Sequence, residues 1–277
     1  MTPPNALRFV QSRTPASRPE ALPEGPEPVD WQGVPLDCTA CQFRSRLDTG
    51  QCGLGWACVH DRYAKRIERF FLLNPELADE CLRMPYFETR INAARVATLF
   101  RLPALLNDED PGVRAMAILR LPVKHAQRRI KDPDRRVRIA VAHRLPVEDL
   151  LPVLSDPDSY VRQIAVRRAD PNVLPTMIGD EDPEIRRQVA RRIRTDWLNR
   201  FIPDPDPLVR REAAERTEPS RLHGFARDED MRVRYVVAER APPDVLHILT
   251  QDPEDVIRET AAERLAEFER EPTNVNR

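Results

Sequence analysis

The chain has 277 residues, enough for one or two domains, and its 44 Lys and Arg residues nearly balance its 45 Asp and Glu residues, so the net charge is −1. This balance excludes a strong overall attraction to nucleic acid or to an anionic membrane surface. No apolar run approaches the roughly 20 residues of a membrane span, and the N-terminus lacks a secretory signal, so we expect a cytoplasmic protein with no membrane contact.

The composition changes along the chain, and the changes predict four parts. Residues 1–30 contain seven prolines and few large apolar residues, which is typical of a disordered leader. Residues 31–84 predict a cysteine-rich module with two helices, one from Cys58 to Leu73 and one from Pro75 to about Leu82. A repeat array follows over residues 85–266, and residues 267–277 form a polar tail that we expect to fray.

The cysteine-rich module holds four cysteines within 21 residues, namely Cys38, Cys41, Cys52 and Cys58. Four thiolates at this density suit either tetrahedral zinc or an iron–sulfur cluster. Only the first pair has the short spacing of a zinc knuckle, and the glycines at 50, 53 and 55 let the backbone wrap closely around a bound group. On these residues alone, zinc and an iron–sulfur cluster both remain open.

Other residues of the module have more ordinary interpretations. Trp31, Phe43 and Trp56 could shield a metal site from solvent. Cys81 lies on an apolar helix face and is expected to be a small buried side chain. His60 could replace one ligand, but four cysteines already suffice.

The array repeats every 24 residues without insertion or deletion, which marks a stacked repeat fold. A branched apolar anchor recurs at Val113, Val137, Val161, Ile185, Val209, Val233 and Ile257. An arginine follows each anchor immediately, and a second arginine lies six residues after the first, at positions 120, 144, 168, 192, 216, 240 and 264. An aspartate stands five residues before each anchor. Residues 85–103 read as a degenerate first copy, with Arg90 on the arginine grid and Val96 in place of the second arginine.

Each repeat predicts one α-helix and one shorter element. Asp-Pro pairs such as Asp132-Pro133 predict an N-cap followed by the first turn, and apolar residues at the anchor and four, five and eight positions later form one helix face. The second half, such as residues 146–155, centres on a leucine (Ala126 in one copy) and often contains proline, which favours a short 3₁₀-helix. A repeat with one longer and one shorter helix is wedge-shaped, and stacked wedges form a superhelix with a concave face.

The arginines and aspartates form regular ladders, for which two interpretations compete. An arginine in every repeat could bind a long anionic partner. The acidic residue three before each anchor, which is aspartate except for Glu254 in the last repeat, lies four residues before the first arginine. This order favours ion pairs within the helix, and the same residues can bridge neighbouring repeats. We expect a structural ladder, and therefore weak binding of nucleic acid.

The 24-residue unit, with its Asp, Val-Arg, small apolar residues and leucine, resembles the leucine-rich repeat variant family over residues 31–266. The resemblance implies an all-α fold, in which α- and 3₁₀-helices alternate in a right-handed superhelical solenoid, with a small N-terminal cysteine-ligated metal module. It also implies that Cys38, Cys41, Cys52 and Cys58 bind a [4Fe–4S] cluster.

Three functions follow as hypotheses. The first is an iron–sulfur protein that binds a protein partner on the concave face and uses its cluster for electron transfer, sensing or structure. The second is an interaction scaffold with a structural zinc site. The third is a nucleic-acid-binding array of HEAT-like repeats. No nucleotide loop, metalloprotease motif or hydrolase motif is present, so we do not expect an enzyme.

Overall fold

A computed structural model describes residues 25–270, and these residues contain helices, turns and two isolated β-bridges but no β-strand. The chain divides into two compact units, residues 1–144 and 145–277, which are treated separately below. Most of the predicted leader and residues 271–277 of the predicted tail lie outside the described residues.

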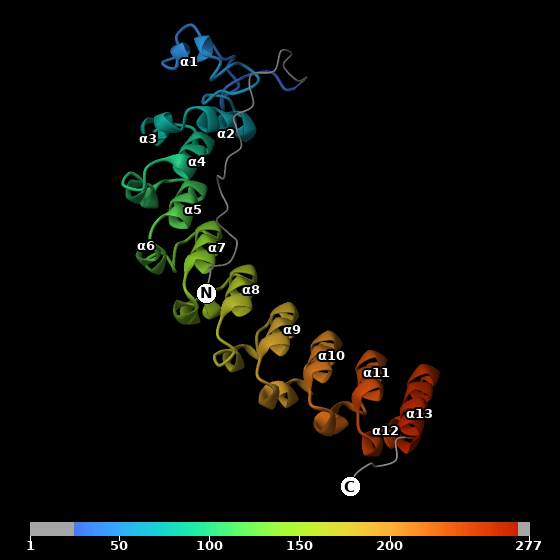
Figure 1. The fold of residues 1–277 in the computed structure, drawn as a ribbon. Helices are drawn as coiled ribbons and strands as arrows, with labels where there is room; N and C mark the ends of the chain where they lie inside the picture. The colour runs from blue at the N-terminus through green and yellow to red at the C-terminus, as the bar shows by residue number, and fades with distance from the viewer. Residues whose placement is uncertain (1–24, 271–277) are drawn as a thin grey trace, which may run out of the picture. The chain divides into compact units, whose positions relative to one another are not determined.

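The first unit contains the cysteine-rich module and the first repeats (Figure 1). Its elements are α1 (Arg44–Asp48), α2 (Ala64–Leu73), η1 (Pro75–Leu77), α3 (Ala78–Cys81), α4 (Phe87–Val96), η2 (Leu102–Asn107), α5 (Pro111–Arg120), α6 (Val123–Gln127) and α7 (Arg135–Arg144). Helix α4 packs against α2 and α5, and α5 packs against α7, so the repeat helices continue the stack that α2 begins.

The second unit consists of repeats only. Its elements are η3 (Val147–Asp149), η4 (Leu151–Ser155), α8 (Ser159–Arg168), η5 (Leu174–Met177), α9 (Pro183–Arg192), η6 (Thr195–Phe201), α10 (Pro207–Arg216), η7 (Pro219–Phe225), α11 (Met231–Arg240), α12 (Pro243–Leu249) and α13 (Asp255–Arg270). Helices α8 to α11 lie side by side in Figure 1, each in contact with the next.

The repeat interpretation is confirmed. All seven anchors are completely buried, as are Ala126 and the leucines of the second halves. A ten-residue α-helix occupies the first half of each repeat from α4 to α11, and 3₁₀-helices occupy most of the second halves. Two second halves, α6 and α12, are α-helical instead, and both lack a proline in their interior.

Several predicted boundaries differ from the structure. The module reaches back before residue 31, because Val29 is buried and forms a bridge with Pro35. The first predicted helix begins at Ala64 rather than Cys58, and the short helix α1 was not predicted. Helix α13 continues to Arg270, beyond the point where we expected fraying.

Where the Asp-Pro pair lies two residues later, as at Asp110-Pro111 and Asp182-Pro183, the aspartate of the pair is the N-cap, as predicted. The aspartates five residues before the anchors are not N-caps, although Asp-Pro pairs predict them as caps in other repeats. The cap is the acidic residue three before the anchor, as in Asp158, whose carboxylate accepts N–H bonds from Tyr160 and Val161. The aspartate five before the anchor accepts the N–H of this cap residue, as Asp156 does from Asp158 at 2.9 Å. At the same position of the next repeat, the buried Asp180 carboxylate also accepts the guanidinium of Arg162 from the preceding repeat.

Both arginine stripes connect successive repeats. The first arginine makes two hydrogen bonds of 2.6–3.1 Å to the carboxylate 18 residues later, in the pairs Arg90–Asp108, Arg114–Asp132, Arg162–Asp180, Arg186–Asp204, Arg210–Asp228 and Arg234–Asp252. The predicted pairs within one helix are not formed by these arginines, because the carboxylate three before the anchor caps its helix instead.

The second arginine satisfies backbone carbonyls of the preceding repeat rather than of its own helix. Arg120 donates to the carbonyl oxygens of Ala94 and Ala97, and Arg168 donates to that of Leu145. These oxygens lie at or just beyond helix ends, where no backbone partner is available. The predicted structural ladder is therefore confirmed, with a different set of partners.

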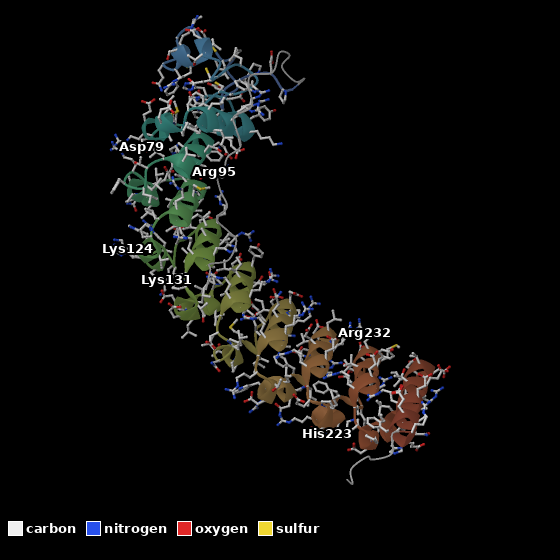
Figure 2. The ribbon with its side chains drawn as sticks, in the orientation of Figure 1. Asp79, Arg95, Lys124, Lys131, His223 and Arg232 are labelled. Carbon is white, nitrogen blue, oxygen red and sulfur yellow. The ribbon has the colours of Figure 1, made fainter. Side chains whose placement is uncertain are left out.

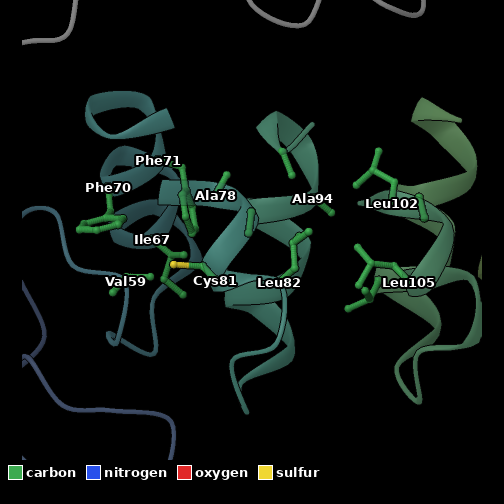
Figure 3. Packing of buried hydrophobic residues seen from close by; sticks show 14 of the residues in the cluster. Val59, Ile67, Phe70, Phe71, Ala78, Cys81, Leu82, Ala94, Leu102 and Leu105 are labelled. Carbon is green, nitrogen blue, oxygen red and sulfur yellow. The ribbon is translucent and has the colours of Figure 1, made fainter. Parts of the chain in front are cut away.

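One apolar core joins the cysteine-rich module to the first repeats (Figure 3). Phe70 and Phe71 from α2 meet Cys81 and Leu82 from the α3 region, and Leu102 and Leu105 continue the core into η2. Cys81 is 1% exposed, which confirms its interpretation as a buried side chain.

Candidate metal centre

The first cysteine pair lies on a loop that is fixed by local backbone bonds. Asp37 accepts the N–H of Thr39 at 2.7 Å, and the Arg44 N–H donates to the Cys41 carbonyl oxygen at 3.0 Å as α1 begins. Before this loop, Asp30 caps a turn in which Gly33 has a φ of 88°, a conformation that favours glycine. The loop thus holds Cys38 and Cys41 ahead of a short helix.

The second cysteine pair flanks a closed turn. The N–H of Gly53 donates to the Ala57 carbonyl at 2.8 Å, and the N–H of Ala57 donates back to the Gly53 carbonyl at 3.0 Å. Gly55 has a φ of 69° within this turn. The five-residue spacing that is too wide for a zinc knuckle therefore folds into a turn with Cys52 and Cys58 at its two ends.

Three of the four cysteines line one hollow of about 580 Å³, namely Cys38, Cys41 and Cys58, and His60 lines the same hollow. Cys52 is not among the lining residues. It is 9% exposed and belongs to the apolar core, against which Cys41 also packs. The structure thus brings three predicted ligands together and places the fourth in the core that lies against one of them.

One sulfur atom accepts a backbone hydrogen bond, because the N–H of Phe43 donates to the Cys41 Sγ at 3.4 Å. Near Cys58, the backbone N–H of His60 acts to lower the pKa of the thiol, although burial outweighs this effect. In each case the N–H group belongs to the residue two positions after the cysteine. Such N–H groups aimed at sulfur are one means by which a protein tunes an iron–sulfur cluster.

Burial keeps the metal-free thiols protonated. Burial raises the pKa of Cys58 to about 12, and it raises the pKa of Cys38, to which the neighbouring Cys41 also contributes. The pKa of His60 is lowered by burial as well. Because a metal binds the thiolate form, cluster assembly would release these protons.

The donor set fits an iron–sulfur cluster. Within residues 25–270, no group of three or more His, Cys, Asp or Glu side chains is arranged to hold a single metal ion. Cysteine thiolates are the usual ligands of iron–sulfur clusters. Three thiols at one hollow and an N–H group directed at the Cys41 sulfur are compatible with such a cluster, while Cys52 lies in the adjoining core.

The aromatic residues shield the site only in part. Phe43 and Trp56 are buried, as expected, but Trp31 is 46% exposed and stacks on Tyr86 with ring centroids 6.1 Å apart. Both Trp31 and Tyr86 line the hollow. Two stacked aromatic rings therefore form part of the lining of the hollow.

Two amide side chains that the sequence analysis did not assign to the site connect the loop before Cys52 to the end of α2. The Asn74 side-chain NH₂ group donates to the carbonyl oxygens of Gln51 and Phe70, both at 2.9 Å, and Asn74 is completely buried. Gln51 donates to the Leu73 carbonyl at 3.4 Å. Gln51 precedes Cys52 directly, so these bonds fix the backbone next to a predicted ligand. Only the Asn-Pro helix start at residues 74–75 drew attention to Asn74.

Known proteins resemble both the repeat array and the cysteine-rich module of this chain. A solved structure described as a leucine-rich repeat variant with a novel repetitive protein structural motif superposes with a TM-score of 0.77 and 38% identity, covering 83% of this chain and 98% of that one. The chain belongs to the leucine-rich repeat variant family. Residues 28–80 match the family described as the LRV protein FeS4 cluster.

A curated relative extends the comparison to one organism. An uncharacterized 27.7 kDa protein of Rhodobacter capsulatus, encoded in the nifB 3′ region, is 69% identical over 106 residues. The alignment spans 38% of this chain and 43% of the relative.

These comparisons identify the protein as a leucine-rich repeat variant with an N-terminal iron–sulfur module. They also agree with a module that begins before residue 31, because the matched residues begin at 28. No helix within residues 25–270 is long and apolar enough to cross a bilayer.

Proposed function

We propose that Cys38, Cys41, Cys52 and Cys58 bind one [4Fe–4S] cluster and that the repeat array binds a protein partner. The gathering of three of these thiols at one hollow, inside the residues that match the iron–sulfur module, carries the first part. Cys52 would complete the set from the core side of the module. When bound, the cluster supplies one-electron chemistry or a rigid cross-link between two loops.

The protein-binding part rests on the repeat fold. Stacked repeats expose a long surface and form a concave face that suits a protein partner. The arginine stripes donate to carboxylates and carbonyls of neighbouring repeats, so they are not free to neutralise a series of phosphates. We therefore propose a binding role in the cytoplasm, rather than a catalytic or nucleic-acid-binding one. The position of the relative's gene near nifB suggests that the partner belongs to the metabolism encoded there.

The ligand set can be tested by replacing single cysteines. Each of Cys38→Ser, Cys41→Ser, Cys52→Ser and Cys58→Ser should remove or alter the visible absorption and the electron paramagnetic resonance signal of anaerobically purified protein. Cys81→Ser is the control, because Cys81 is a buried thiol of the same unit that lies outside the proposed set. An unchanged signal in Cys52→Ser, or a signal lost in Cys81→Ser, would contradict the assignment.

A further inference from the structure

One segment of the first unit carries charge of a single sign. Residues 111–131 contain no Asp or Glu, but they contain Arg114, Arg120, Lys124, Arg128, Arg129 and Lys131, together with His125. Two of the three lysines of the chain lie here, although the whole protein has a net charge of −1. The segment comprises α5, α6 and the turns that follow α6.

Half of these cations are already engaged in holding the fold. Arg114 pairs with Asp132, and Arg120 caps carbonyls of the preceding repeat. Arg129 donates to the Asn107 side chain at 2.6 Å.

The other three cations, Lys124, Arg128 and Lys131, are exposed and form no hydrogen bond or ion pair with any residue between 25 and 270. They are spaced by four and three residues along α6 and its following turns. Figure 2 shows Lys124 and Lys131 on the edge of the unit formed by the second halves of the repeats, away from α4, α5 and α7.

A fully exposed aromatic residue stands at the equivalent place in the preceding repeat. Phe100 lies 24 residues before Lys124 and is 95% exposed, and its neighbour Leu99 is 49% exposed. The turn that carries them is fixed, because the N–H and the hydroxyl of Thr98 donate to the Asp79 carboxylate at 2.7 and 2.8 Å. Phe100 is therefore held in solvent by an ordered loop, in the repeat before the one that carries the three unpaired cations.

We propose that Phe100, Lys124, Arg128 and Lys131, here called the basic surface, bind an acidic protein surface that offers an apolar pocket to Phe100. Phe is enriched at protein interfaces and Arg at their hot spots, and polar residues form the rim around the buried part of an interface. Complementary charge on the partner would steer association and set the orientation. Three free cations within one repeat could neutralise only a few phosphates, and this favours a protein over nucleic acid.

This inference goes beyond the proposed function, because it rests on neither the cluster nor the concave face. Its probe is a fluorescent peptide that combines Glu and Asp residues with a central Leu-Phe pair, titrated by anisotropy at ~150 mM salt. The intact, cluster-loaded protein should bind the peptide. The triple variant Lys124→Glu/Arg128→Glu/Lys131→Glu should lose about tenfold or more in affinity, as expected when interface charges are reversed. Phe100→Ala should lose several-fold.

The matched control reverses three exposed arginines of the second unit, in the variant Arg200→Glu/Arg221→Glu/Arg227→Glu. It changes the net charge equally and should retain binding. The inference is overturned by no binding of the peptide, by an equal loss in the control variant, or by tighter binding of a single-stranded DNA of the same charge through the same residues. Cluster absorbance, recorded for every variant, separates a failure of this surface from a failure of the proposed metal site.

Discussion

The junction between the cysteine-rich module and the repeats is built differently from the interfaces between successive repeats. Between repeats, one arginine pairs with a carboxylate 18 residues later and another caps carbonyls of the preceding repeat. At the junction, Val96 replaces the second arginine, and Met84 stands 18 residues after Arg66, where the repeats carry aspartate. Arg66 instead pairs with Asp61 at 2.8 Å, within the module itself.

The apolar core, neutral hydrogen bonds and one exposed ion pair hold the junction. Thr89 of α4 donates across it to the Val59 carbonyl at 2.9 Å, and Arg95 of α4 pairs with Glu68 of α2 at 3.0 Å. On the module side of the junction, Asn74 and Gln51 bond the carbonyl oxygens near the end of α2. The difference shows that one stack can use two kinds of attachment. Repeat interfaces depend on buried charge pairs, whereas the module side of the junction depends on amide bonds placed one residue from Cys52. Damage to these amide bonds should therefore reach the metal site, while damage to a repeat interface should not.

The largest effect on stability is expected from breaking one buried charge pair between repeats. Asp180→Ala leaves Arg162 without the carboxylate that accepts two of its hydrogen bonds, in a pair whose side chains are 6% and 5% exposed. Removing one partner of such a pair costs about 3–5 kcal/mol. Denaturant unfolding should show this loss, and the cluster spectrum should be unchanged.

The control for that change uses the same arginine. Glu181 also contacts Arg162, at 3.1 Å, but its side chain is 83% exposed. Glu181→Ala should cost about 0–1 kcal/mol, as for surface ion pairs. Equal effects of the two substitutions would show that the buried pair does not hold the repeats together.

A smaller loss of stability, accompanied by an effect on the metal site, is expected at the junction. Asn74→Ala removes two buried hydrogen bonds and should cost about 1–3 kcal/mol in the free energy of unfolding. Because one acceptor is the Gln51 carbonyl beside Cys52, the cluster should also be lost faster to an iron chelator. Asp180→Ala should leave that rate unchanged. If both variants lose the cluster at the wild-type rate, the junction does not support the metal site.

The smallest effect on stability is expected from titrating the carboxylates that cap the repeat helices. The amide groups at the junction do not titrate. A hydrogen bond from Arg232 is the main cause that lowers the pKa of Asp230 from 3.8 to about 2. The folded-state pKa is depressed, so its contribution to stability is present above about pH 4 and is lost as the pH falls towards 2. A carboxyl titration by NMR should show this low value, and Arg232→Ala should raise it towards 3.8. A midpoint already near 3.8 in the unmodified protein would contradict the ion pair.

The sequence predicted the fold better than it predicted the contacts. The anchors and the leucines were identified by their period alone, because a fixed 24-residue step leaves a single consistent buried face. The cap at Asp158 was assigned to Asp156 instead, since both residues precede the helix and either could accept its N–H groups. The partner of Arg162 could not be read from local spacing, because it lies 18 residues away in the next repeat.

The sequence predicted candidate ligands for the metal centre, but it did not predict what surrounds them. The density of cysteines identified the module, and the turn between Cys52 and Cys58 explains a spacing that looked too wide. The positions of His60 at the hollow and of Cys52 in the core depend on how two loops pack, which no local pattern encodes. The assignment of all four cysteines as ligands remains a prediction.

Metal and sulfide analysis of anaerobically purified protein tests this account most directly. The proposed cluster predicts brown protein with about four irons and about four acid-labile sulfides per chain, and negligible zinc. Stoichiometric zinc without labile sulfide would contradict the account and would favour a scaffold with a structural zinc site.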